Sequence, residues 1–294
     1  MVQVPGTDDW YIAYHRFAIP DGDGTHRETT IDRLEFAADG SIVPVVPTLE
    51  SIEPIRPINT APVIIAVTGP AGPVAVGAEV NVTATFTDNG ADDTHRCVLV
   101  WGDGATGTGT IDGSACVASH TYATPGVYRP TVTVIDDRGG AHTMAAGYVA
   151  VHRAAGGYVA GSGRFTSQAG AYPADPTLAG RAEFGFVAAA GPGATGPGAA
   201  ALRFRLGDLE FRATSHRGYV VDGPQVRFNG RGTINGAGDY TYMVGLNDAA
   251  LRGSGKDRFW IRITDAATGT VVYDSRTNAT TTALDGGSIV VALR

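Results

Sequence analysis

Three side chains near the middle of the chain are of the types that form a hydrolytic triad: Asp103, Ser119 and His120. Such a triad requires a nucleophile and a base within hydrogen-bond reach of each other in a cleft. Gly102 and Gly104 flank Asp103, a pattern typical of a tight turn in which the carboxylate accepts backbone N–H bonds. We therefore expect these residues to stabilise the fold rather than to catalyse hydrolysis.

Cys97 and Cys116 are the two cysteines of the 294-residue chain. A disulfide between them would close a loop of about twenty residues and stabilise the fold by about 3 kcal/mol. Two buried free thiols are the alternative, and zinc is disfavoured because the pair lacks the ligand number and spacing of a zinc site. Because both cysteines flank one hairpin-like connection, we favour the disulfide, which indicates an oxidising compartment.

Acidic side chains gather in places where a hard cation such as Ca²⁺ could find oxygen ligands. One such place is an acidic loop formed by Asp88, Asn89, Asp92 and Asp93. Another candidate set consists of Asp239, Asp248 and Asp257. The alternative for both sets is ordinary loop and turn carboxylates, which is also how we interpret Asp21, Asp23 and Asp39.

Two further patterns suggest a ligand. Trp260 and Tyr219 are the best candidates for aromatic platforms under a sugar ring, although Trp260 could equally pack between layers. Glycines at positions 230, 232, 236 and 238 resemble a phosphate-binding loop in spacing. Such a loop lies between a strand and a helix, and no helix is expected here, so we interpret these glycines as belonging to a bulge or a turn.

The elements that must position these residues are β-strands. Short apolar runs are bounded by Gly, Asp, Asn and Pro, and no long stretch has helical periodicity, so we expect an all-β protein. The net charge is −7, and no run of basic residues stands out, which argues against nucleic-acid or anionic-membrane binding. No segment is apolar for long enough to span a bilayer, and we expect a monomer.

Residues 1–57 predict three short strands, at 10–16, 30–36 and 42–45, separated by Asp-Gly turns. Three strands without a partner layer are only marginally stable. A proline-rich linker at 53–62 follows, which predicts an extended connector.

The segments WYIAYHRF and IDRLEFAADGSIVPVVPT resemble the last blade of the five-bladed propeller of glycoside hydrolase family 43. The resemblance implies that residues 1–57 are a propeller-blade remnant. The family's three catalytic carboxylates lie in earlier blades, so the resemblance assigns no catalytic residue here. It also implies that His15 would point toward a bound metal or water in a complete propeller. The alternative for His15 is a histidine at a strand end that bonds to backbone.

Residues 58–152 predict a β-sandwich with turns at immunoglobulin-like intervals. Val80, Val82, Ala84 and Phe86 alternate with polar residues, Cys97, Leu99 and Trp101 share one face, and a Gly/Thr-rich loop is expected after Gly104. Trp101-Gly102-Asp103-Gly104, together with His120, Tyr122, Gly126 and Tyr128, resembles the polycystic-kidney-disease (PKD) repeat. The family resemblance makes these residues structural, and some of its members bind Ca²⁺ near the domain ends.

Two residues of this domain carry specific expectations. Tyr122 precedes a Pro-Gly turn and should be a corner tyrosine that bonds back to the backbone. Pro130 stands where the PKD family usually has an inward aliphatic residue. Because proline cannot donate to a ladder, we expect an edge position or a bulge there.

Residues 153–294 predict an antiparallel β-sandwich in which apolar residues alternate with Arg or Glu, with a Gly/Pro/Ala loop at 189–199. NGRGTINGAGDY, KDRFWIRI and TGTVVYDS resemble a β-rich C-terminal module that follows PKD repeats in secreted bacterial proteins. The resemblance implies a fold and a set of companion domains, but no activity.

These observations predict a non-catalytic accessory region that spaces, stabilises or docks a secreted carbohydrate-active protein, with polysaccharide or a cell-surface glycan as partner. The alternatives are a glycosidase for arabinan or xylan that is truncated here, and an adhesion or glycan-binding protein. The first fifteen residues lack the basic and apolar regions of a signal peptide. Either the protein is cytoplasmic or its true N-terminus is missing, and we favour the second because the cysteine pair indicates an oxidising compartment.

Overall fold

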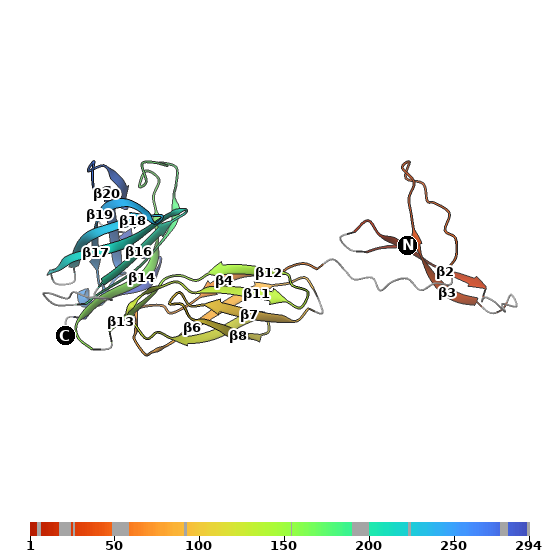
Figure 1. Ribbon diagram of the computed structural model, residues 1–294, viewed down its shortest axis with the longest axis horizontal. Coiled ribbons are helices and arrows are strands. Elements are labelled where there is room, and N and C mark those ends of the chain that lie inside the picture. Colours follow the sequence, from red (N-terminus) through yellow and green to blue (C-terminus); the bar gives the residue numbers. More distant parts are fainter. Residues whose placement is uncertain are drawn as a thin grey trace. The chain divides into compact units, whose positions relative to one another are not determined.

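The computed structural model describes residues 1–4, 7–17, 25, 27–48, 59–90, 93–153, 155–189, 200–222, 225–276 and 282–292 (Figure 1). The chain forms two compact units, residues 1–60 and residues 61–294. The regular secondary structure of the described residues is almost entirely β-strand, as predicted. No helix among them is long and apolar enough to cross a membrane. The linker residues 53–58 and most of the loop at 189–199 lie outside the described residues.

The first unit is a three-stranded antiparallel sheet in the order β1-β2-β3. Its strands are β1 Val2–Gln3, β2 Trp10–Phe17 and β3 Arg27–Leu34. The predicted strand at 42–45 is wrong, because Ile42 makes only an isolated bridge to Phe36. Asp39 accepts a 3.0 Å bond from the Ser41 N–H, which makes it the turn residue that was expected.

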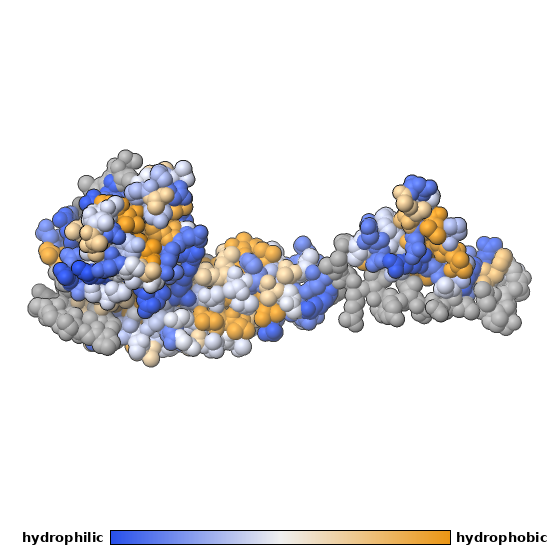
Figure 2. All heavy atoms as spheres, turned by 45° about the horizontal axis from the view of Figure 1, so that its top comes forward, coloured by the Kyte–Doolittle hydropathy of each residue, from blue (hydrophilic) through white to orange (hydrophobic). Residues whose placement is uncertain are grey.

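Few apolar side chains of this unit are buried. Val4 and Leu34 are the buried apolar residues among those described in the unit, whereas Phe17, Ile31, Phe36 and Val46 are exposed. Figure 2 shows orange, hydrophobic atoms on the surface of this unit. The sheet therefore has no layer of its own to cover its apolar side chains, as expected for three strands.

The second unit begins with a β-sandwich, residues 61–152, which we call the first sandwich. Its strands are β4 Val63–Thr68, β5 Val74–Ala75, β6 Glu79–Thr87, β7 His95–Val100, β8 Thr106–Asp112, β9 Ala115–Thr121, β10 Gly126–Tyr128, β11 Thr131–Asp136, β12 Ala141–Ala145 and β13 Val149–His152. Seven of them form a continuous sheet in the order β12-β11-β7-β8-β9-β6-β4, and β10, β13 and β5 form a second sheet. The predicted inward residues of β6 and β7 are all buried in its core.

Strand β8 corrects the prediction of a Gly/Thr-rich loop. Its first half pairs with β7 and its second half pairs with β9, so it carries the sheet from one side of the core to the other. A Cβ at Gly109 would lie 2.7 Å from both cysteine sulfurs, and one at Gly107 would lie 3.2 Å from Trp101 Nε1. The glycines therefore face the core and leave room for the disulfide and the indole, while the threonines face solvent.

Pro130 does not lie at a bulge or in an edge strand, so that prediction was wrong. It is buried between β10 and β11, where the chain passes from the smaller sheet to the larger one. Its carbonyl accepts a 2.8 Å bond from the Ala146 N–H. Because the crossing point needs no ladder donor, the missing proline N–H leaves no gap in either sheet.

Residues 158–292 form the second sandwich. Its elements are β14 Tyr158–Ser167, β15 Gly180–Ala189, β16 Ala200–Leu206, β17 Leu209–Asp222, β18 Gln225–Ile234, β19 Ala237–Asn247, the 3-10 turn η1 Ala250–Arg252, β20 Arg258–Asp265, β21 Val271–Asp274, β22 Thr282–Ala283 and β23 Gly286–Ala292. The strands form one antiparallel sheet in the order β21-β20-β19-β18-β17-β16-β15-β14-β23, with β22 beside β20.

This sheet folds over so that its two halves face each other across one core, like the layers of a sandwich. Phe184 of β15 and Phe259 of β20 stack with ring centroids 3.9 Å apart, and Phe204 of β16 lies against Tyr273 of β21. These aromatic side chains are almost completely buried. The alternation predicted for this region is thus confirmed, with the apolar residues turned inward and Arg or Glu turned outward.

Two of the candidate cation ligands instead serve the edge of β23. Asp257 Oδ2 accepts a 2.6 Å bond from the Ile289 N–H, and Asp248 Oδ2 accepts a 3.0 Å bond from the Val291 N–H. Their other oxygens accept N–H bonds from Ala249 and Ala250. Because an unpaired strand edge exposes backbone donors, both carboxylates act as structural caps here.

The two sandwiches contact each other within residues 61–294. Val127 and Tyr148 of the first sandwich form a small core with Val187 of the second. A Cβ at Gly185 would lie 2.6 Å from Val127 Cγ1, so the glycine lets the two sheets approach. The guanidinium of Arg129 lies 3.4 Å from the Glu183 carboxylate across the same junction.

Candidate functional site

The turn after β7 and the end of β9 bring together Asp103 and His120. His120 Nε2 and Asp103 Oδ2 are 2.8 Å apart, and Asp103 Oδ1 accepts a 2.9 Å bond from the Ala105 N–H. Burial alone would raise the pKa of the Asp103 carboxyl, but the bonds from His120 and Ala105 outweigh burial and lower that pKa. The turn that the flanking glycines predicted is present, with φ +86° at Gly102 and +98° at Gly104.

The rings around this pair are packed as a column. The imidazole of His120 stacks on Trp101 at 4.9 Å and meets Tyr122 edge-on at 4.6 Å. Tyr122 donates a 2.9 Å bond to the Trp101 carbonyl, as expected of a corner tyrosine, and stacks on Tyr128. Burial raises the pKa of the Tyr122 hydroxyl. The Asp103 carboxylate, His120 Nε2 and the Tyr122 hydroxyl therefore each have a structural partner.

Ser119 does not complete a triad with these residues. It precedes His120 on strand β9, and successive strand residues point to opposite faces of a sheet. Ser119 is exposed and lies opposite Asn81 of β6. A histidine and an aspartate without the serine have no nucleophile to activate at this position.

The predicted disulfide between Cys97 and Cys116 is confirmed. Cys97 lies in β7 and Cys116 in β9, and both side chains are buried in the core of the first sandwich. Both neighbouring strands pair with β8, so the disulfide crosses behind that strand at Gly109.

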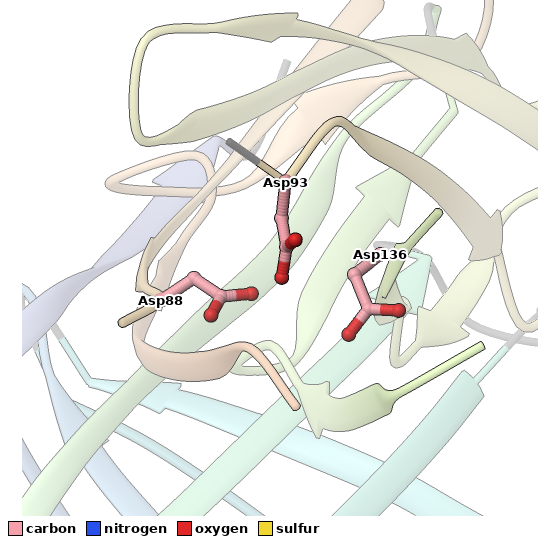
Figure 3. A group of neighbouring side chains, drawn as sticks. All are labelled: Asp88, Asp93 and Asp136. Atoms are coloured by element: carbon pink, nitrogen blue, oxygen red, sulfur yellow. The ribbon is translucent and has the colours of Figure 1, made fainter. Parts of the chain in front are cut away.

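Three carboxylates converge at one end of the first sandwich (Figure 3). Asp88 follows β6, Asp93 precedes β7 and Asp136 ends β11. Each offers one oxygen, and these oxygens lie within 4.8 Å of one another. Among the described residues they are the one group of three or more His, Cys, Asp or Glu side chains with such spacing.

Asp136 was missing from the predicted acidic loop. It is separated from Asp93 by more than forty residues of sequence, so no local motif joins them. In the ladder between β11 and β7, however, Asp136 lies opposite His95. Recognising that β11 pairs with β7 would have placed Asp136 beside the loop that precedes β7. Of the other predicted loop members, Asn89 is exposed and Asp92 lies outside the described residues.

Two of the three carboxylates have hydrogen-bonding partners close by. Asp88 Oδ2 lies 2.9 Å from His95 Nε2, and Asp136 Oδ1 accepts the N–H groups of Arg138 and Gly140. Burial opposes ionisation of Asp88, yet the bonds from Gly90 and His95 outweigh burial and lower the pKa of its carboxyl.

Asp93 is the most enclosed of the three, with a side chain that is 1% exposed. Arg138 Nη2 lies 2.7 Å from its Oδ1, but at an angle that makes no hydrogen bond. Its Oδ2 has no donor among the described residues. Asp93 Oδ2 therefore lies buried beside the oxygens of Asp88 and Asp136, and converging carboxylate oxygens are the ligands that a hard divalent cation such as Ca²⁺ prefers.

The remaining metal candidates do not join a cluster in the described part of the chain. His15 is exposed on β2, with Thr29 Oγ1 3.5 Å from its Nε2. Asp239 forms an ion pair with Arg231. Asp248 and Asp257 cap β23, as described above. Asp21 and Asp23 lie outside the described residues.

Trp260 is not the open sugar platform that was considered. Its side chain points to the outer face of β20 and lies flat over Gly245, where any Cβ would collide with the indole. The guanidinium of Arg276 covers the other ring face at 4.0 Å from the centroid, and Trp260 is 5% exposed. The side chain of Tyr219 lies outside the described residues.

The glycines once compared with a phosphate loop belong to a hairpin. Gly230 and Gly232 lie in β18, which has a bulge just after Gly232. Gly236 and Gly238 have positive φ at the turn into β19. No helix follows this turn, so the strand–loop–helix context of a phosphate loop is not present here.

Comparison with known proteins supports the resemblance of the first sandwich to the PKD domain. Residues 59–151 match the family model of the PKD domain. No curated protein matches the chain. A solved structure from a study of the promiscuous specificity of carbohydrate-binding modules of the β-sandwich superfamily aligns over 81% of this chain and 94% of its own. That alignment has 17% identity and a TM-score of 0.30, which is too low to support an argument.

Proposed function

We propose that residues 59–294 are a non-catalytic accessory region of a secreted carbohydrate-active protein. In this proposal the first sandwich is a stable spacer and the second sandwich docks on a polysaccharide or a cell-surface glycan. The observation that carries it is the column at the PKD motif. There the strongest catalytic candidates, His120 and Asp103, are held by Trp101, Tyr122 and Ala105 and have no nucleophile. The disulfide supports an extracellular location, because such bonds persist in oxidising compartments.

The proposal includes a larger parent. Residues 1–57 would be the last blade of a glycoside hydrolase family 43-like propeller, and a complete protein would be a glycosidase for arabinan or xylan. The exposed apolar side chains of β2 and β3 support this idea, because neighbouring blades of a propeller would cover them. Reading the genomic sequence upstream of the Met1 codon tests it. In-frame blades with three acidic residues are expected, and an intact promoter there would contradict it.

Two assays on the purified chain test the accessory role. Incubation with aryl arabinofuranoside or xyloside should release no more chromophore than buffer, because glycosidases need at least a pair of positioned carboxylates. Retention on insoluble arabinan or xylan, compared with an unrelated β-sandwich protein of similar size, separates docking from spacing alone. Hydrolysis above the buffer rate would overturn the proposal.

The carboxylate group supports a second role, a Ca²⁺ site that stabilises the first sandwich. Asp88, Asp93 and Asp136 would be its ligands, and the buried Oδ2 of Asp93 is the observation that favours it. Ca²⁺ at a hundred times its dissociation constant should raise the free energy of unfolding by about 2.7 kcal/mol. Thermal unfolding with Ca²⁺ or EDTA measures this. Asp136→Asn should abolish the effect, and Asp137→Asn at the exposed neighbouring position should keep it. No Ca²⁺ effect on the unmodified chain would contradict the site.

A further inference from the structure

The outer face of strands β17–β20 carries regularly spaced arginines. Across the ladders, Arg217 lies opposite Asn229, Asn229 lies opposite Met243, and Met243 lies opposite Arg262. Arg231 lies in the adjacent row, opposite Thr241, which pairs with Thr264. We call this surface the arginine face. It is built from Arg217, Asn229, Arg231, Thr241, Arg262 and Thr264.

Strand alternation keeps these side chains outside. On β18, Val226, Phe228 and Gly230 are buried, whereas Arg227, Asn229 and Arg231 are exposed. The arginine face encloses a hollow of about 390 Å³. Its side chains are thus available to a ligand that lies across the strands.

The charge of the arginine face is not neutralised within the described residues. Arg231 pairs with Asp239 and Arg262 pairs with Asp274, but Arg217 has no acidic partner there. Arg227, two residues before Asn229 on the same face of β18, also has no acidic partner among the described residues. Asp274 is shared with Arg276, so Asp239 and Asp274 each already face at least one guanidinium. An approaching anion would therefore meet unpaired positive charge.

Basic and acidic residues are also distributed unevenly along the whole chain. Residues 153–294 contain 15 of the 22 basic residues and 11 of the 29 acidic residues. Residues 1–152 hold the remaining 7 basic and 18 acidic residues. The second sandwich is therefore the net positive part of a chain whose total charge is −7.

The chemistry of the face selects among ligands. A planar guanidinium binds a carboxylate through two parallel hydrogen bonds, while Asn229, Thr241 and Thr264 suit neutral hydroxyl groups. A neutral sugar is often held by an open aromatic ring, but Tyr242, which lines the hollow, is buried, and the outward ring of Trp260 is covered by Arg276. Single-stranded nucleic acid would likewise need open aromatic rings for its bases. A polymer that alternates carboxylates and hydroxyls satisfies both kinds of side chain.

We propose that the arginine face binds an acidic polysaccharide, with Arg217, Arg231 and Arg262 contacting uronate carboxylates. This inference rests on the proposed docking function of the second sandwich and names the chemical class of its ligand. Binding is electrostatic and should weaken as salt screens the charges.

Calorimetric titration of the full chain with polygalacturonate tests the proposal, and methyl-esterified polygalacturonate is the matched neutral ligand. We expect binding of the acid form, at least tenfold weaker binding of the ester, and a further loss between 50 and 200 mM NaCl. Arg217→Gln should weaken binding about tenfold, because a hydrogen bond to a charged group is worth one or more decades of affinity. Arg181→Gln, at an exposed position on β15, is the matched control and should change little.

Equal binding of acid and ester, or an unchanged affinity of Arg217→Gln, would overturn the proposal. A single-stranded oligonucleotide that binds more tightly and displaces polygalacturonate would overturn it as well. The salt and ester comparisons use the unmodified chain, so they decide the question even if a variant misfolds. Binding to neutral arabinan or xylan with no binding to the acid form would sink this inference but leave the docking function intact. Hydrolysis of aryl arabinofuranoside or xyloside would overturn the non-catalytic role, but it would not by itself contradict the binding of an acidic polysaccharide to the arginine face.

Discussion

Residues 1–60 and residues 61–294 are both mainly antiparallel β-structure, and both carry apolar residues along their strands. Among the described residues, no second layer covers strands β1–β3, and Phe17, Ile31 and Phe36 are exposed. The strands of residues 61–294 fold over one another, and their apolar residues form continuous cores. An apolar side chain on a strand is therefore buried only where a partner layer covers it.

Separating the two parts should have the largest effect. Residues 61–294 alone should unfold in a cooperative transition at the same denaturant concentration as the full chain. Residues 1–60 alone should show no cooperative transition, because a single small sheet buries too little apolar surface. Circular dichroism during urea titration measures both. A sharp transition for residues 1–60 would show that the two parts do not differ in this way.

Matched aromatic truncations sharpen the same contrast. Phe259→Ala in the second sandwich should lower the free energy of unfolding by about 3–5 kcal/mol, because it leaves a cavity among stacked rings. Phe36→Ala in residues 1–60 should leave the transition of residues 61–294 unchanged. Met243→Ala, on the outer face at 46% exposure, should cost about 0.5 kcal/mol or less. Similar losses for Phe259→Ala and Met243→Ala would contradict the assignment of inner and outer faces.

The disulfide stabilises only the larger part. Replacing both Cys97 and Cys116 by alanine should lower the free energy of unfolding of the first sandwich by about 3 kcal/mol. Dithiothreitol should destabilise the unmodified chain by a similar amount and leave the alanine variant unchanged. Urea unfolding with and without the reductant gives both values. A reductant effect on the variant would mean that the loss has another source.

Removing a single hydrogen bond of the PKD motif should have a smaller effect than removing the disulfide. Tyr122→Phe removes the donor to the Trp101 carbonyl and leaves that carbonyl unpaired in the core. The expected loss is about 1–3 kcal/mol. Tyr128→Phe is the matched control, since its hydroxyl bonds to Thr124 at the surface. Equal losses in the two variants would argue against a special role for the corner tyrosine.

Much of the fold could be predicted because strand alternation is a local property. The inward residues of β6 and β7 and the apolar positions of the second sandwich followed from a period of two. Strand β8 was missed for the opposite reason. Its inward residues are glycines, whose small size fits the disulfide and Trp101, and glycine carries no apolar signal.

The candidate sites depended more strongly on long-range pairing. Asp88 and Asp93 are neighbours in sequence and were both predicted, but Asp136 joins them only because β11 pairs with β7. Asp248 and Asp257 were predicted as candidate cation ligands, but their carboxylates accept N–H bonds from the edge of β23, which lies more than thirty residues further along the chain. Trp260 points outward, which strand alternation allowed. The Arg276 side chain that covers its ring comes from the segment just after β21.

The sequence by itself determined the all-β class, the PKD motif, the cysteine pair and the face to which each strand turns its apolar residues. These follow from local spacing and from residue types with narrow chemical roles. Only the tertiary structure decided which carboxylates meet, which aromatic rings stay open and which arginines form one surface. Those outcomes depend on strand order and register, which bring side chains together across tens of residues of sequence and which no local pattern encodes.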